Sequence, residues 1–193
     1  MRAILLKIRN KRLSKKRPKI IWGYQRKHDG KYLERVRISN ATFLDFEEKM
    51  DISNNVFIGH FNFIEASNEL TIEEGVQITN FVTITTHSSH QSIRLYGAKY
   101  TGPNMVGYKK GAVHIGKYSF VGPHSTIMPG TTIGKGCIVS AYSYVKGDFP
   151  DFSIIGGNPA TVIGDTRDAD HKILAEHPEL KAHYNEWSGE NLD

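Results

Sequence analysis

A period of six residues is the sequence feature that most restricts how this chain can fold. Aliphatic residues recur at every sixth position in the second half of the chain, at Ile115, Val121, Ile127, Ile133, Val139 and Val145. A small or β-branched residue stands two positions before each, at Val113, Ser119, Ser125, Thr131, Cys137 and Ser143. Six matches neither the 3.6-residue turn of a helix nor the simple alternation of one strand. The pattern therefore predicts short strands with a turn at every sixth residue.

The same spacing occurs earlier in the chain. It runs through Ile52, Ile58, Ile64 and Leu70, and after a shift of two residues it continues as Ile72, Ile78 and Ile84. The β-branched aliphatics, the glycines and the prolines among these residues all oppose a helix. Stacked turns of this kind bury one continuous core and leave little free strand edge. A parallel β-helix is the expected fold.

Three segments near the end of the repeat resemble a known family. They are Ile127-Met-Pro-Gly-Thr-Thr-Ile-Gly-Lys-Gly, Tyr144-Val-Lys-Gly-Asp-Phe-Pro and Ser153-Ile-Ile-Gly-Gly-Asn-Pro-Ala. They resemble the last coils of hexapeptide-repeat acyltransferases, in the sugar O-acetyltransferase and xenobiotic acetyltransferase branches. The resemblance covers residues 36–164 and implies a mainly β protein with a left-handed parallel β-helix. It also implies a homotrimer that binds acetyl-CoA, the acyl donor, between neighbouring subunits.

The repeat is interrupted between residues 85 and 112, and this interval is too long for a turn. Long loops that leave a rigid scaffold are often functional. The loop opens with Thr85-Thr-His-Ser-Ser-His, and histidine suits the removal of a proton from an acceptor near neutral pH. In the family that the chain resembles, a histidine at the opening of such a loop is the general base. His87 is the first candidate and His90 the second. The polar and aromatic residues Arg94, Tyr96, Tyr100 and Asn104 suit a sugar-like or phosphate-bearing acceptor.

The resemblance also implies a cofactor groove between coils of adjacent subunits. The matching positions are Gly122, Ser140, Ala141, Lys146 and Asn158, with Arg167 and Lys146 as candidate donors to the phosphates of CoA. At Gly122 and Asn158, a turn required by the fold explains the residue as well as ligand contact does. His60, His114 and His124 lie within the repeat and raise the alternative of a zinc site shared between subunits, as in γ-type carbonic anhydrases. The sequence shows no tight set of histidines, so we expect no metal.

Positive charge is concentrated at the start of the chain. Residues 1–40 hold 14 Lys and Arg but only two acids, Asp29 and Glu34, whereas the remainder has a net charge of −7. Residues 1–35 are therefore expected to form a basic arm, with apolar Ile4, Leu5 and Ile8 at roughly helical spacing. Such an arm can pack on a neighbouring subunit, lie on an anionic membrane surface or bind nucleic acid. The pattern favours the first two.

The composition is that of an ordinary globular protein, with 39% hydrophobic and 23% charged residues, which excludes collagen and disorder throughout. The single cysteine, Cys137, excludes an internal disulfide, and no apolar run is long enough to span a membrane. These features favour a cytoplasmic protein, with the arm available for the inner membrane face. Residues 165–193 are acidic and are expected to form a short helical cap on the last coil.

The combined expectation is an acetyl-CoA-dependent enzyme that transfers an acetyl group to a sugar hydroxyl in surface-polysaccharide or lipopolysaccharide synthesis. An N-acetyltransferase of an amino sugar, free or nucleotide-linked, is the alternative within the same fold. A β-helix scaffold without catalytic activity, or the zinc protein described above, is the alternative of another class. The sequence does not reveal which acid would orient the histidine.

Overall fold

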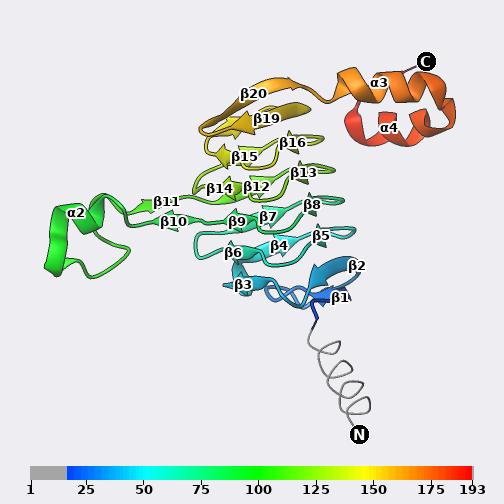
Figure 1. The fold of residues 1–193 in the computed structure, drawn as a ribbon. Helices are drawn as coiled ribbons and strands as arrows, with labels where there is room; N and C mark the ends of the chain where they lie inside the picture. The colour runs from blue at the N-terminus through cyan, green and yellow to red at the C-terminus, as the bar shows by residue number, and fades with distance from the viewer. Residues whose placement is uncertain (1–16, 193) are drawn as a thin grey trace, which may run out of the picture.

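The computed structural model describes residues 17–192. Short strands stack into a parallel β-helix with three faces (Figure 1). Face A is an eight-stranded sheet with β1 (Ile20–Gln25), β2 (Tyr32–Ser39), β5 (Phe57–Ile58), β8 (Gln77–Ile78), β13 (Phe120–Val121), β16 (Ile138–Val139), β19 (Ser153–Gly157) and β20 (Ala160–Asp165) in that order. Only the outer pairs, β1–β2 and β19–β20, are antiparallel within this face. The predicted parallel β-helix is confirmed.

The other two faces have five parallel strands each. Face B contains β3 (Phe43–Asp45), β6 (Phe63–Glu65), β9 (Thr83–Ile84), β14 (Thr126–Ile127) and β17 (Tyr144–Val145). Face C contains β4 (Met50–Ile52), β7 (Leu70–Ile72), β12 (Val113–Ile115), β15 (Thr132–Ile133) and β18 (Asp148–Phe149). The chain passes from face C to A to B in each coil. We call the turn from A to B the AB corner and the turn from B to C the BC corner.

The residues of the six-residue period fill the interior of the solenoid. All six aliphatics from Ile115 to Val145 are fully buried, and they align with their neighbours in register, as Ile115 does with Ile72 and Ile133. Burying one such side chain contributes about 1.5–3 kcal/mol, so the ladders account for most of the hydrophobic stabilisation. Cys137 is also fully buried, and burial raises the pKa of its thiol to about 11. It is a packing residue at a coil corner.

Nearly every lengthening of the period occurs at the BC corner. Aligned core residues on faces B and C are eight positions apart in the first two coils, from Leu44 to Ile52 and from Ile64 to Ile72, instead of six. In the third coil the same corner expands into residues 85–112, between Ile84 and Ile115. The three corner segments therefore lie one above another on one edge of the solenoid.

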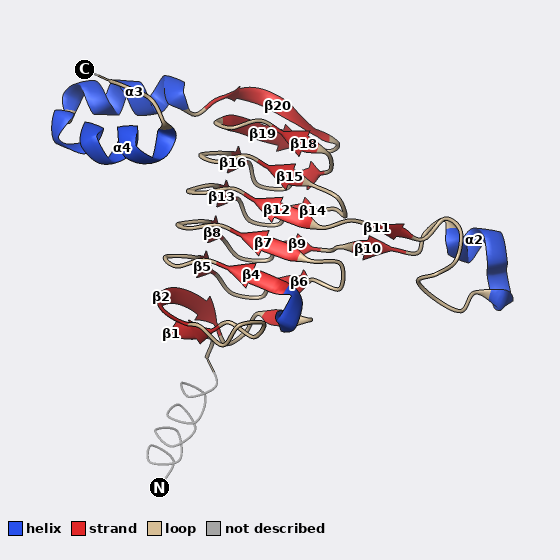
Figure 2. Cartoon of the chain, turned by 180° about the vertical axis from the view of Figure 1, so that it is seen from behind, coloured by secondary structure: helices blue, strands red, loops and turns tan. Residues whose placement is uncertain are grey.

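The expanded corner leaves the solenoid as a two-stranded ribbon. Strands β10 (His87–Ser88) and β11 (Lys109–Lys110) pair antiparallel, and His87 lies opposite Lys110. Beyond them the loop carries α2 (Ser92–Tyr96) and the short 3-10 helix η2 (Gly97–Lys99). Figure 2 shows this excursion projecting from one side of the solenoid and the C-terminal helices from the other.

The two ends of the solenoid are closed differently. Residues 20–35, which the charge pattern places in the basic arm, instead belong to the β1–β2 hairpin at one end, where Leu33 and Val36 are buried in the core. The many cations mask the strand alternation, and Asp29-Gly30 supplies the turn. The rest of the arm, residues 1–16, lies outside the described residues.

The other end carries the helices of the C-terminal segment. They are α3 (Arg167–Glu176), the 3-10 helix η3 (Pro178–Leu180) and α4 (Lys181–Ser188); a further 3-10 helix, η1 (Glu47–Lys49), lies at the first BC corner. Trp187 joins α4 to the solenoid by ring contacts with Tyr118 and Phe152 at 5.0 and 5.8 Å. Within residues 17–192, no helix has the length and apolar character needed to cross a membrane.

Candidate functional site

A cavity of about 480 Å³ lies on the edge formed by the lengthened BC corners. All three corner segments contribute to its wall. The lining residues are Phe46 and Lys49 from the first segment, Ser67 and Asn68 from the second, and His87, Pro103, Tyr108 and Lys110 from the excursion. The departures from the six-residue period thus converge on one place, and this place contains the first candidate for the general base.

His87 is held there by a buried carboxylate that the sequence did not reveal. Its Nδ1 lies 2.9 Å from Oε2 of Glu65, the last residue of β6, in the coil below. Ser67 Oγ lies 3.2 Å from the same nitrogen. The Glu65 side chain is 3% exposed, whereas the His87 side chain is 37% exposed. The acid is therefore internal, and the imidazole reaches the cavity.

The surroundings of Glu65 favour its charged form. Burial by itself raises the pKa of the carboxyl group, but hydrogen bonds from Ser67 and Thr86 outweigh this effect and lower the pKa below its usual value. The backbone N–H and the hydroxyl of Thr86 donate to Oε2 at 2.9 and 3.0 Å. An ionised carboxylate can only accept hydrogen bonds, so Nδ1 of His87 carries the hydrogen. A neutral imidazole then has its lone pair on Nε2, which is the arrangement a general base needs.

Aromatic stacking fixes the plane of the imidazole. The rings of His87 and Tyr108 lie 5.6 Å apart with an interplanar angle of 5°. Lys110 extends over the Tyr108 ring, with Nζ 5.8 Å from its centroid. Burial raises the pKa of Tyr108 above its ordinary value, which keeps the phenol neutral near pH 7. Glu65 therefore holds the Nδ1 edge of the His87 ring, and Tyr108 holds its face.

His90, the second candidate, has a different environment. It is exposed, and its Nδ1 lies 2.8 Å from Ser88 Oγ, within the excursion itself. The backbone carbonyl of His90 accepts a hydrogen bond from the guanidinium of Arg94 in α2. His90 does not line the cavity, and among the described residues the ring has Ser88, not a carboxylate, as its hydrogen-bond partner. The geometry favours His87.

The expected acceptor-binding residues of the excursion lie apart from the cavity wall. Arg94 and Tyr96 are in α2, and Tyr100 and Asn104 follow η2; none of the four lines the cavity around His87. Tyr100 lies near enough to Tyr108 to influence its pKa, and Asn104 follows the cavity residue Pro103. Their role in acceptor binding stays a prediction, while Lys49 and Asn68 are cavity residues that the sequence did not single out.

The expected cofactor residues Gly122, Ser140 and Ala141 lie together at the AB corner, in successive coils. A Cβ atom on Gly122 would lie 2.6 Å from the carbonyl oxygen of Val139 and 2.7 Å from the nitrogen of Ala141, so close stacking of coils requires glycine here. The carbonyl of Ser140 accepts hydrogen bonds from the hydroxyls of Ser125 and Ser143 at 3.0 and 2.7 Å. The corner is rigid and rich in small residues.

The remaining expected cofactor residues are dispersed. Lys146 is exposed at the BC corner that follows β17, and Asn158 is exposed in the turn between β19 and β20. Arg167 begins α3, where its guanidinium is paired with Asp165 at 2.6 Å and with Glu190 at 3.4 Å. These partners engage Arg167 in the attachment of the C-terminal helices. Its contact with a CoA phosphate stays a prediction.

The other histidines of the repeat lie outside the lining of the cavity around His87. His60 Nδ1 lies 2.6 Å from Ser39 Oγ, and His114 Nε2 lies 3.3 Å from Glu73 Oε1. His124 is stacked between Phe81 and Tyr142 at the AB corner, with ring centroids 4.9 and 4.8 Å away. Within residues 17–192, no three His, Cys, Asp or Glu side chains gather in a way that could hold a metal ion.

Comparison with known proteins shows that part of this solenoid is similar to hexapeptide-repeat transferases. Residues 112–147 match the family model of the bacterial transferase hexapeptide (six repeats). This segment covers β12 to β17, the coils above the excursion, and it does not include His87. The match confirms the predicted resemblance to hexapeptide-repeat transferases.

One particular relative extends the comparison beyond this segment. The chain is 32% identical over 113 residues to the putative lipopolysaccharide biosynthesis O-acetyl transferase WbbJ of Escherichia coli (strain K12). The matched region covers 58% of this chain and 58% of WbbJ, so the chain spans little more than half the length of that relative.

Solved structures share the fold. The maltose O-acetyltransferase from Clostridium difficile 630 has a TM-score of 0.53 at 22% identity, over 65% of this chain and 64% of that chain. AntD, an N-acyltransferase from Bacillus cereus in complex with dTDP and 3-hydroxybutyryl-CoA, has a TM-score of 0.57 at 21% identity, over 78% of this chain and 89% of that chain. At these identities the likeness is one of fold.

Proposed function

We propose that this chain is an acetyl-CoA-dependent acetyltransferase that acts on a sugar hydroxyl. The observation that carries the proposal is the His87–Glu65 pair at 2.9 Å, which opens on the cavity of the BC corner. The relative WbbJ and the solved neighbours support an acyltransferase, since all are named as such. The name of WbbJ supports a glycan hydroxyl in lipopolysaccharide or another surface polysaccharide as the acceptor.

The reaction needs one base and no covalent enzyme intermediate. Nε2 of His87 takes the proton of the acceptor hydroxyl as its oxygen attacks the thioester carbonyl carbon. Glu65 stabilises the imidazolium that forms, because its carboxylate accepts the Nδ1 hydrogen. The tetrahedral intermediate then collapses with cleavage of the carbon–sulfur bond. The imidazolium returns the proton to the CoA sulfur, so the products are the acetyl ester and free CoA thiol.

An amine acceptor is the second candidate. The same base can remove the proton from an amine, and AntD, with a similar fold, is an N-acyltransferase. The two candidates differ only in the acceptor, so an assay that offers both kinds of sugar separates them.

The positions of the expected ligands support an assembly of several copies. His87 lies at the BC corner, whereas Gly122, Ser140 and Ala141 lie at the AB corner, and face B separates the two. One chain therefore does not bring its own cofactor corner to its own base. In a closed three-fold ring, the AB corner of one subunit is able to meet the BC corner of the next. We propose this homotrimer, with acetyl-CoA bound between neighbouring subunits.

The experiment that tests the function is a thiol-release assay with acetyl-CoA and a panel of sugars, amino sugars and nucleotide-linked sugars. We expect release of CoA with at least one hydroxyl acceptor, and loss of turnover in His87→Ala with unchanged binding of acetyl-CoA. Full activity of His87→Ala would transfer the role of base to His90. Absence of both turnover and CoA binding would favour the scaffold.

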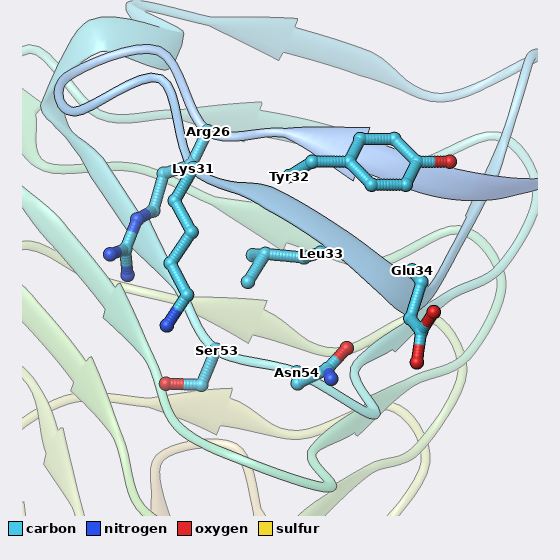
Figure 3. A pocket seen from close by; sticks show the side chains of 7 residues that line it. All are labelled: Arg26, Lys31, Tyr32, Leu33, Glu34, Ser53 and Asn54. Atoms are coloured by element: carbon cyan, nitrogen blue, oxygen red, sulfur yellow. The ribbon is translucent and has the colours of Figure 1, made fainter.

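The N-terminal end of the solenoid supports a further part of the proposal, contact with an anionic membrane. Trp22 and Tyr32 on the β1–β2 hairpin are each 65% exposed, and both residue types favour the membrane–water interface. A cavity of about 320 Å³ lies beside the hairpin, and Figure 3 shows Lys31 extending along one side of it. The neighbouring Arg26 is paired with Asp29 and Asp51, so Lys31 is the cation of this cavity that a membrane can reach. Cations near an anionic surface contribute about 1 kcal/mol each.

Vesicle binding tests this contact. We expect the protein to sediment with vesicles of mixed neutral and anionic lipid at low salt, and Trp22→Ser together with Lys31→Gln to weaken the binding severalfold. Thr132→Ser, an exposed change on face C, is the matched control. Equal binding to neutral and anionic vesicles, or a preference for nucleic acid over vesicles, would contradict the contact.

A further inference from the structure

The lysines around His87 have no counterpart in the proposed chemistry. Acetyl transfer to a neutral hydroxyl needs a base and an oriented thioester, yet Lys49 and Lys110 both line the cavity that contains His87. They reach it from different segments, one from the first BC corner and one from the excursion. Each is connected to His87 through one intervening residue, Ser67 for Lys49 and Tyr108 for Lys110, so the fold fixes their place in the wall.

Lys49 is connected to the His87–Glu65 pair through one intervening residue, Ser67. Its Nζ donates a hydrogen bond to the backbone carbonyl of Ser67 at 2.7 Å, and the hydroxyl of Ser67 lies 3.2 Å from Nδ1 of His87. The ammonium also lies 5.7 Å from the centroid of the Phe46 ring. An ammonium has three hydrogens to donate, and the carbonyl takes one, which leaves two for a ligand.

Lys110 reaches the cavity from the excursion. It pairs with His87 across the β10–β11 ribbon, and its ammonium lies over Tyr108, which in turn stacks on the imidazole. The two cations are thus linked to the base through different residues, Lys49 through Ser67 and Lys110 through Tyr108.

The nearby carboxylates lie outside the lining of the cavity around His87. Glu65 is buried and engaged by Ser67, Thr86 and His87. Glu47 accepts a hydrogen bond from Tyr24 at 3.2 Å, whereas Glu48, Asp51 and Glu69 line a second cavity, which Lys49 also borders. None of the carboxylates lines the cavity around His87. The wall that faces an incoming acceptor therefore carries an excess of positive charge.

We propose that Lys49 and Lys110 form a subsite for an anionic group on the acceptor, a phosphate or a carboxylate attached to the sugar that is acetylated. The proposal rests on the proposed acetyl transfer and names the class of its acceptor. Charge-assisted hydrogen bonds to such a group hold the sugar while its hydroxyl lies at Nε2 of His87. Because these bonds do not change as the acetyl group moves, they lower KM rather than raise kcat.

A matched set of acceptors tests the subsite. Thiol release is measured at saturating acetyl-CoA with galactose, galactose 1-phosphate, UDP-galactose and galacturonate, which separate a monophosphate, a nucleotide diphosphate and a carboxylate from the neutral sugar. We expect kcat/KM to be roughly tenfold or more higher for at least one anionic member. Lys49→Gln and Lys110→Gln should each raise the KM for that acceptor roughly tenfold while kcat stays within about twofold, and the KM for galactose should change much less than the KM for the anionic acceptor. Lys99→Gln, an exposed lysine in the same excursion, is the control.

Two results would overturn the subsite while acetyl transfer stands. One is equal kcat/KM for galactose and all its anionic forms, and the other is a rise in the KM for acetyl-CoA instead of the acceptor. If no sugar is turned over, the proposed function fails on this panel, and titration calorimetry of His87→Ala with UDP-galactose then decides the subsite alone. If UDP-galactose binds to His87→Ala and this binding is lost when Lys49 and Lys110 are also replaced by glutamine, the subsite is supported. If UDP-galactose does not bind, or binds equally well without the two lysines, the subsite is overturned.

Discussion

His87 depends on a residue 22 positions earlier in the chain, and this distance explains why the pair is invisible in the sequence. Glu65 follows an aliphatic core residue in β6 and occupies an ordinary position at a corner. Only the stacking of coils brings it below Thr86 and His87. Its cost of burial is offset by donors from Ser67 and Thr86, as expected for a buried charge that is retained.

Removing the charge of Glu65 should disable the base without unfolding the corner. In Glu65→Gln, the amide can donate a hydrogen bond to Nδ1 of His87 and so stabilise the tautomer that carries its hydrogen on Nε2. In that tautomer Nε2 has no lone pair to take the proton of the acceptor. We expect kcat to fall roughly 100-fold or more, with the Kd for acetyl-CoA unchanged. Steady-state kinetics and equilibrium binding measure the two quantities. Glu73→Gln, which removes the partner of His114 on face C, is the matched control and should keep full activity.

The same carboxylate makes stability depend on pH. The pKa of Glu65 is lowered in the folded chain, so its contribution to stability is complete above the pKa of the unfolded chain, near 4.3, and is lost as the pH falls through the folded value. Between pH 7 and pH 3, the thermal midpoint of the wild type should therefore fall more than that of Glu65→Gln, which has no carboxyl group to protonate. Parallel melting curves for the two proteins would refute this linkage.

At the scale of elements, the regular part of the fold is predictable and the irregular part is not. The six-residue spacing predicts which residues are buried, because each coil needs one inward side chain per face. The shift of two residues between Leu70 and Ile72 is also visible in the sequence, and it marks the corner that contributes Ser67 and Asn68 to the site. What the spacing does not contain is the vertical stacking of three lengthened corners. The hairpin of residues 20–39 is likewise not predicted, because its many Lys and Arg residues obscure the alternation of apolar and polar side chains.

Close stacking at the AB corner should make Gly122 intolerant of any side chain. A Cβ atom there would meet backbone atoms of the next coil at 2.6 and 2.7 Å, and the backbone cannot move aside as a flexible side chain can. We expect Gly122→Ala to lower the free energy of unfolding by about 1–3 kcal/mol. Chemical denaturation measures this, with the exposed strand change Thr132→Ala as the control. An unchanged midpoint would show that neighbouring coils separate more easily than the contacts indicate.

The whole molecule is organised along its axis and around it. Along the axis, the exposed Trp22 and Tyr32 mark one end, and α3 and α4 cover part of the other. Around the axis, the base with its lysines occupies one corner, and the small residues expected to meet CoA occupy another. In the proposed homotrimer, this separation is the physical reason that the sequence of one chain does not define a complete site. A residue's corner can be read from the period, whereas in that assembly the corner that faces it belongs to another copy.

Mixing two inactive variants tests whether the site is shared between subunits. His87→Ala removes the base at the BC corner, and Ala141→Arg places a large side chain on the expected cofactor groove at the AB corner, where Ala141 is exposed. Each variant alone should lack activity. If neighbouring subunits complete each other's site, random co-assembly in equal amounts gives a wild-type base opposite a wild-type groove in roughly one quarter of sites. Co-expressed and jointly purified variants should then recover about that fraction of wild-type kcat. No recovery, in assemblies shown by mass to contain both variants, would place base and cofactor in the same chain.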